Sequence, residues 1–172
     1  MYQYLGANRE TAAATEIAMS MGILQRIRSL ISTEARLLDD LAALAGKNQG
    51  LVDRLHRHAQ RCKYEQMAPV LTELASKEQA HVKALSTILS EHRTWAKLPE
   101  APTHEGLNDW ERLSGDLELL SEIGLSMGQL AVFWEGLNTV ITERLREISA
   151  EDSENSRTLR ILALKADPHA LD

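Results

Sequence analysis

The segment DWERLSGDLELLSEIGLSMGQLAVFWEGLNTVITERLREIS, residues 109–149, decides the class of fold. From Leu113 to Ile148 its apolar positions follow one another in steps of three and four, which places them on one face of a helix. Asn108 precedes the segment as an N-cap, with Glu111 as its capping-box partner. The pattern predicts one long helix over 109–149, packed against neighbouring helices or a partner chain.

Two segments before this one show the same periodicity. Residues 11–45 and 51–95 are each predicted to form a long helix, with a turn at 46–50, where two glycines flank Asn48. Pro69 predicts a kink in the second helix, or a break with a new helix starting near Ala68. A loop is expected over 96–108 and a short helix over 152–166. The expected fold is all-α: one domain, residues 1–172, forming an elongated antiparallel bundle of three long helices plus a short C-terminal helix.

The composition excludes several classes of protein. Of the 172 residues, 44% are hydrophobic, 26% are charged and only 4% are aromatic, which favours a soluble helical domain. The single cysteine excludes an internal disulfide and indicates a reducing compartment. No apolar run is long enough to span a membrane, and the first residues lack a signal-peptide pattern. We therefore expect a cytoplasmic protein. Its net charge of −6 argues against nucleic acid as a partner.

Charge is unevenly distributed along the chain. Residues 105–154 hold twelve acids and three arginines, whereas 47–63 hold one acid, Asp53, and five bases. The five bases are Lys47, Arg54, Arg57, Arg61 and Lys63. Three interpretations follow: the basic stretch binds an anionic membrane or a partner, it contacts the chain's own acidic segment, or both stretches are solvated faces.

One motif has the spacing of a metal site. Glu78 and His81 form an E-x-x-H pair on an apolar helix face, and Glu34 occupies an equivalent place on the first helix. Di-iron bundles use a Glu from each of two helices and an E-x-x-H from each of the other two. The third helix offers Met127 and Asn138 on its apolar stripe but no acid. Half of the ligand set is thus missing, and we expect no stoichiometric metal and no cofactor.

The stretch around this motif nevertheless resembles a known family. Residues 64–68, 73–75 and the pair Glu78 and His81 resemble the rubrerythrin and ferritin-like proteins over about 18 residues. The resemblance implies a metal-binding four-helix bundle with iron as cofactor, held by Glu34, Glu78 and His81.

Other motifs indicate no enzymatic chemistry. His58 and Cys62 lie four residues apart on one helix face, as zinc ligands do, but no third or fourth ligand accompanies them. The chain holds no Gly-rich phosphate loop, nucleophile elbow or Cys-x-x-Cys pair. We therefore expect a protein that is not an enzyme.

A second resemblance covers more of the chain. The run KALSTILS at 83–90, then Trp95, then the helix opening with Trp110, Leu113, Leu117 and Leu120, resembles the BAR domains of sorting nexins over 51–145. It implies a dimer that binds anionic membranes. The apolar stripe of the third helix supplies the expected dimer contact, through Leu120, Met127, Trp134, Ile141 and Leu145.

The preferred interpretation is a non-enzymatic, self-associating BAR-like module that binds anionic membranes or protein partners in trafficking. We expect it in the cytoplasm or peripherally on membranes, as a homodimer. The alternatives are the ferritin-like metal protein and a helical scaffold with an unknown partner.

Overall fold

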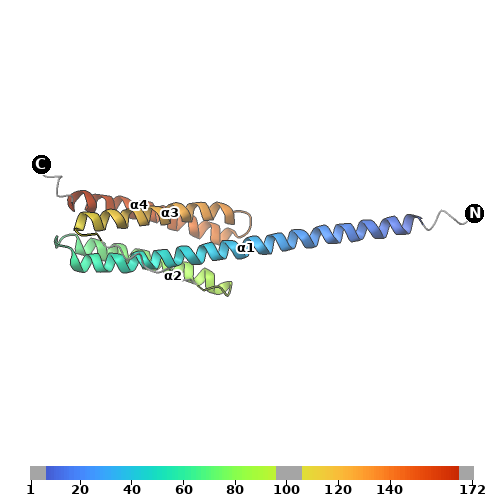
Figure 1. The fold of residues 1–172 in the computed structure, drawn as a ribbon, viewed down its shortest axis with the longest axis horizontal. Helices are drawn as coiled ribbons and strands as arrows, with labels where there is room; N and C mark the ends of the chain where they lie inside the picture. The colour runs from blue at the N-terminus through green and yellow to red at the C-terminus, as the bar shows by residue number, and fades with distance from the viewer. Residues whose placement is uncertain (1–6, 96–105, 167–172) are drawn as a thin grey trace, which may run out of the picture. The chain divides into compact units, whose positions relative to one another are not determined.

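The computed structural model describes the backbone of residues 7–95 and 106–166, and side chains from residue 29 onward within those ranges. These residues form four α-helices and no strand: α1 (Ala7–Arg61), α2 (Ala68–Glu91), α3 (Asp109–Trp134) and α4 (Thr139–Ala166) (Figure 1). The all-α prediction is confirmed. Most of the predicted loop at 96–108 lies outside the described residues.

The chain divides into two compact units, Met1–Arg36 and Leu37–Asp172. In the first unit, α1 is a helix whose predicted apolar stripe at Ile17, Leu24 and Ile27 lies outside the described side chains. Leu30 and Ile31, which continue that stripe, are exposed. The second unit is a four-helix bundle formed by residues 37–61 of α1 together with α2, α3 and α4.

The turn predicted at 46–50 is wrong, because α1 continues through it to Arg61. Leu44, Leu51 and Leu55, on both sides of the two glycines, are buried. Each glycine costs a helix about 1 kcal/mol relative to alanine, whereas each buried leucine contributes about 1.5–3 kcal/mol, so burial outweighs the propensity. The turn lies at 62–67 instead. The predicted break before Ala68 is confirmed, with Pro69 in the first turn of α2.

The single helix predicted for 109–149 is also wrong, because the structure has two helices in this range. Its start is correct, since Asn108 Oδ1 accepts the Glu111 N–H at 2.8 Å. However, α3 ends at Trp134 and α4 begins at Thr139. Gly136 adopts φ +82°, and Asn138 Oδ1 accepts the Ile141 N–H at 3.1 Å, which caps α4. The C-terminal helix therefore has 28 residues rather than being the short helix expected at 152–166.

The order of the helices in the bundle follows from a few contacts. The Lys63 N–H donates to the Asp109 carboxylate at 3.0 Å, so α3 begins beside the end of α1. Because α2 has 24 residues and is about 36 Å long, Glu91 lies at the opposite end of the bundle. The connection from α2 to α3 therefore joins opposite ends. Two antiparallel pairs, α1 with α2 and α3 with α4, are linked by one lengthwise crossover.

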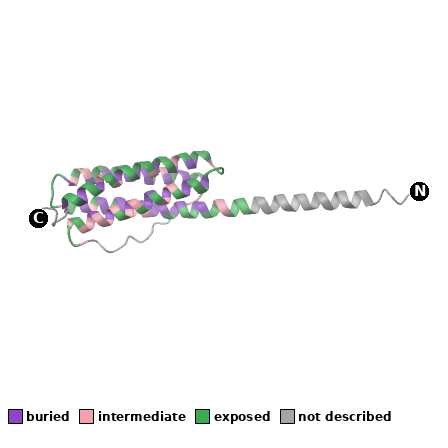
Figure 2. Ribbon diagram, turned by 90° about the horizontal axis from the view of Figure 1, so that it is seen from above, coloured by how far each residue is buried: buried purple, intermediate pink, exposed green. Residues whose placement is uncertain are grey.

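The core lies between these four helices, whose buried faces turn inward (Figure 2). Trp134 is the largest fully buried side chain, at 1% exposure. The stripe predicted to contact a second copy belongs to this core, because all of its members are 3% exposed or less: Leu120, Met127, Trp134, Ile141 and Leu145. The stripe therefore packs against the chain's own helices and is not available to a partner. Sequence periodicity identified the buried face but not what covers it.

Candidate metal centre

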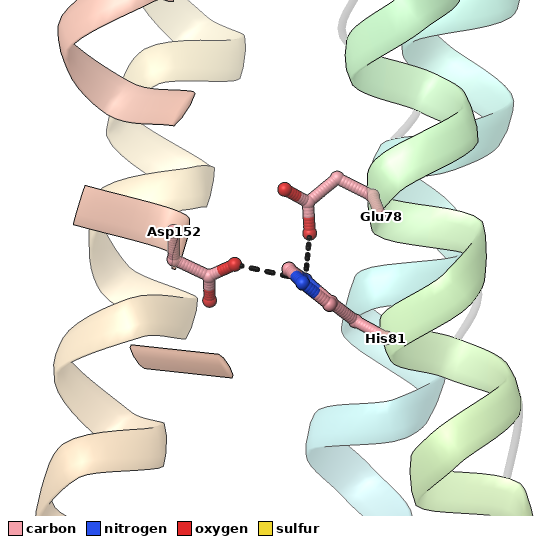
Figure 3. A group of neighbouring side chains, drawn as sticks. All are labelled: Glu78, His81 and Asp152. Carbon is pink, nitrogen blue, oxygen red and sulfur yellow. Dashed lines mark hydrogen bonds and ion pairs between the residues drawn. The ribbon is translucent and has the colours of Figure 1, made fainter. Parts of the chain in front are cut away.

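Three ligand-type side chains meet inside the bundle (Figure 3). Glu78 and His81 project from α2, three residues apart on its inward face, and Asp152 projects from α4 opposite them. All three are buried, and one ligand atom of each lies within 4.8 Å of the others. In the part of the chain that the structure describes, no other group of three or more His, Cys, Asp or Glu has this geometry.

The His81 ring is oriented from both of its nitrogens. Nδ1 lies 3.1 Å from Glu78 Oε2 and 3.1 Å from Asp152 Oδ1, so it faces the two buried carboxylates. Nε2 lies 2.6 Å from Glu151 Oε2, a carboxylate at the surface. Metal-binding histidines have this arrangement, with one nitrogen toward the ligand set and the other donating to an outer carboxylate.

The two buried carboxylates differ in how they are satisfied. Glu78 Oε1 accepts a hydrogen bond from Asn155 Nδ2 at 2.7 Å. Neither oxygen of Asp152 has a hydrogen-bond partner, because its 3.1 Å contact with His81 is an ion pair without hydrogen-bond alignment. A buried carboxylate without hydrogen bonds is costly unless a cation compensates it. In the metal-free chain the ion pair with His81 compensates this charge, and a metal ion fits the same place.

The electrostatics of the cluster point the same way. Burial lowers the pKa of His81, but contacts with the three surrounding carboxylates outweigh burial and raise this pKa to about 10. Burial and the Glu78 carboxylate raise the pKa of Asp152 to about 6, although His81 lowers it. At neutral pH the centre therefore holds an imidazolium between two acids, and a metal ion has to displace that proton.

The α1 helix contributes Asn48 at the same level. Lys47 Nζ bonds Glu122 of α3, and Gln49 Oε1 accepts from Gln79 of α2. Since successive helical residues are about 100° apart, Asn48 points between these two contacts, toward the bundle axis. It is fully buried, and neither its Oδ1 nor its Nδ2 has a hydrogen-bond partner. Asn48 is thus a buried amide without a partner on the inward face of α1.

The donor set fits one metal ion and not two. The α2 helix supplies a complete E-x-x-H, but α4 supplies Asp152 and Asn155 at the same spacing, with an amide where a di-iron set has histidine. The α3 helix has no donor here: Gly124 faces Asp152, and a Cβ on this glycine would lie 2.9 Å from Asp152 Cβ. The side chains present therefore offer ligands for one ion.

Of the metal ligands predicted from sequence, the structure brings Glu78 and His81 together. Glu34 belongs to the N-terminal unit, Met1–Arg36, and is not in the group. Sequence reasoning missed Asp152 and the neighbouring amides. The available signal was D-x-x-N at 152–155, which repeats the i,i+3 spacing of the E-x-x-H pair with a shorter acid and a neutral partner.

The five basic residues between positions 47 and 63 lie in different environments. Lys47 pairs with Glu122 at 2.6 Å, and the buried Arg54 lies 2.9 Å from Asp116 Oδ1. These two residues thus contact the acidic α3, one of the alternatives the sequence left open. The other three are half-buried or exposed: Arg57, Arg61 and Lys63.

The zinc pair considered above is not supported. His58 Nδ1 contacts the buried Asp116 carboxylate, and burial raises the pKa of the Cys62 thiol. A raised pKa disfavours the thiolate that binds metals.

Comparison with known proteins identifies the fold. No protein-family model and no curated protein matches the sequence. Among solved structures, the chain is similar to a ferritin-like diiron-carboxylate protein from Bacillus anthracis (14% identity, TM-score 0.71, covering 76% of this chain and 97% of that one). It is also similar to Dps from Thermosynechococcus elongatus (11% identity, TM-score 0.72, covering 83% and 98%).

A third similar structure is a dodecameric thioferritin, a bacterioferritin-related protein from Bacteroides fragilis (14% identity, TM-score 0.68, covering 80% and 93%). The chain therefore has the ferritin-like fold, and the lengthwise crossover agrees with it. The ferritin-like resemblance seen in the sequence is confirmed for the fold.

Two expectations are overturned. The BAR-like, membrane-binding interpretation is wrong, because the similar structures are ferritin-like. None of the described helices is long and apolar enough to cross a membrane. The expectation of no cofactor is corrected by the buried group of Glu78, His81 and Asp152, which the sequence did not predict as a set.

Proposed function

We propose that this chain is a ferritin-like metal-binding protein that holds one iron ion at Glu78, His81 and Asp152. The observation that carries the proposal is the buried Asp152 carboxylate, which has no hydrogen bond and lies beside the His81 nitrogen that faces it. A similar structure is described as a diiron-carboxylate protein, which supports iron as the metal.

The chemistry of the donors supports the same metal. Two carboxylates with one imidazole suit ferrous iron and manganese, whereas copper and zinc favour more nitrogen or sulfur. When bound, iron supplies one-electron redox chemistry and Lewis acidity. The chain's own residues hold the ligands in place: Glu151 orients the His81 ring through Nε2, and Asn155 donates a hydrogen bond to Glu78.

Anaerobic titration of the metal-free chain with Fe(II) tests this proposal. We expect saturation at one iron per chain, and at least a hundredfold weaker binding in an Asp152→Asn variant, which keeps the side-chain shape but removes the charge. Glu154→Gln, on the exposed side of the same helix, is the matched control and should bind like the parent. Two irons per chain, or unchanged binding by Asp152→Asn, would contradict the proposal.

We further propose that the chain forms a homodimer. The predicted stripe cannot serve this role, but a different set of large apolar side chains is exposed at one end of the bundle: Leu125, Val132, Phe133 and Val140. The similar thioferritin is described as dodecameric, which makes self-association plausible for this fold.

A further inference from the structure

A pocket of about 340 Å³ lies between α3 and α4, with Asp152 in its wall. The α4 residues that line it, from Ser149 to Arg160, recur at steps of three and four and so form one stripe along the helix. Asp152 stands near one end of this stripe. Arg160 stands eight residues further on, about 12 Å along the helix axis. The pocket thus runs from a metal ligand to a basic end.

The pocket extends to Asp152 because the facing helix has no side chain there. A Cβ on Gly124 would lie 2.9 Å from Asp152 Cβ and 3.5 Å from its Oδ2, so any larger residue would have to displace Asp152. A glycine inside a helix costs about 1 kcal/mol relative to alanine. The close approach of α3 to Asp152 requires glycine at 124 in spite of this cost.

Apart from the Asp152 carboxylate, the polar groups in the pocket without a partner can all donate hydrogen bonds. Ser149 and Ser153 donate to backbone carbonyls, Gly124 O and Ser149 O respectively. Ser121 and Ser156 make no hydrogen bond with any residue the structure describes, and the antiparallel register that sets Gly124 against Asp152 places these two hydroxyls opposite each other.

The basic end adds a charge that is not neutralised. Arg160 forms no ion pair within the described ranges 7–95 and 106–166, whereas Arg157 pairs with Glu154 at 2.7 Å. Helical side chains lean toward the N-terminus of their helix, so both guanidinium groups lie over the turn that carries Ser153 and Ser156. A guanidinium beside hydroxyl donors is the usual recognition element for an oxyanion.

We propose that this pocket binds a small oxyanion through Arg160, Ser156 and Ser121, with Arg157 at its rim. The anion site stands on these residues alone. Only its position beside a metal ion rests on the proposed function, since the metal would compensate the Asp152 charge at the other end. The substrate or co-ligand of the metal centre would then be an anion of phosphate size or a small carboxylate.

Titration of the metal-free full-length chain with inorganic phosphate, followed by calorimetry, tests the anion site. We expect one saturable site, with at least tenfold weaker binding in Arg160→Gln and in Ser156→Val. Arg146→Gln is the matched control, because Arg146 lies on the same helix, outside the pocket, paired with Glu135. No saturable phosphate binding by the parent, or equal binding by Arg160→Gln, would overturn the proposal.

A second measurement separates this proposal from the metal proposal. Mn(II), a paramagnetic ion suited to carboxylate ligands, is added and the phosphorus resonance of bound phosphate is recorded. Line broadening in the parent but not in Asp152→Asn supports an anion beside the metal. Phosphate binding that depends on Arg160, with no metal bound by any form of the chain, would support the anion site and contradict only the metal proposal.

Discussion

At the scale of single residues, the proton on His81 occupies the place of a bound cation. The imidazolium lies 3.1 Å from one oxygen of Glu78 and 3.1 Å from one oxygen of Asp152, so it partly neutralises both acids. Its pKa of about 10 means that this proton is present across the physiological range. A metal ion therefore competes with a proton for the same position.

This competition predicts that metal affinity depends on pH. Because the metal-free pKa of His81 is about 10, binding at pH 6.5–7.5 releases about one proton, and affinity changes about tenfold per pH unit. Anaerobic Fe(II) titration should give about tenfold tighter binding at pH 7.5 than at pH 6.5. Titration in two buffers of different ionisation enthalpy counts the released protons. Equal affinities at the two pH values would show that His81 is not a ligand.

A second residue-scale prediction concerns Asn48, whose buried amide points toward the bundle axis with no partner. Asn48→Asp adds a carboxylate of nearly the same shape, so we expect Fe(II) to bind at least tenfold more tightly. The metal-free variant should be less stable by about 1–3 kcal/mol, since it buries a further acid. Gln60→Glu, at an exposed position of the same helix, is the control and should change neither quantity. Unchanged affinity would place Asn48 outside the ligand set.

At the scale of elements, the break between α3 and α4 depends on two residues. Gly136 takes a left-handed backbone conformation, and Asn138 caps the following helix. Asn138→Ala should lower the free energy of unfolding by about 1 kcal/mol, since it removes the cap. Thr139→Ala, at the exposed next position, should change it by less than about 0.5 kcal/mol. Denaturant unfolding measures both, and a larger effect from Thr139→Ala would contradict the assigned cap.

These two residues also show how far the sequence could predict the elements. Helical periodicity predicted the all-α class, the start of α2 near Ala68 and the Asn108 cap of α3, because all three depend on local chemistry. It could not separate the glycine at 136, where the helix ends, from those at 46 and 50, where burial of the flanking leucines keeps α1 continuous. The decisive difference between these glycines is the tertiary packing of the residues around them.

For the same reason, only part of the candidate site could be predicted from the sequence. Glu78 and His81 are three residues apart, so their spacing alone places them together. Asp152 lies 71 residues further along the chain than His81, and only the pairing of α2 with α4 brings it close. The wrong turn at 46–50 implied a different pairing of the first two helices, which did not place Asn48 beside Glu78. A correct turn would have set Gln49 beside Gln79 and placed Asn48 on the axis.

At the scale of the whole molecule, the centre joins the two antiparallel pairs of the bundle. Glu78 and His81 come from the first pair, and Asp152 comes from the second. This arrangement leaves the outer faces of α3 and α4 free of any role in metal binding. On the outer face of α3, Leu125 and Val132 are seven residues apart and therefore share one stripe, with Phe133 beside it.

This outer stripe and the start of α4 predict the oligomeric state. Leu125, Val132, Phe133 and Val140 are 61–75% exposed, an apolar surface that a second copy can cover. We expect a dimer that buries more than about 1,000 Å² and sediments at twice the chain mass at micromolar concentration. Phe133→Glu should sediment as a monomer, because it places a charge in the contact. Leu164→Glu, equally exposed near the opposite end of α4, should remain dimeric. A monomeric parent, or a dimeric Phe133→Glu variant, would contradict this interface, whereas monomers of Leu164→Glu alone would move it to the C-terminal end of α4.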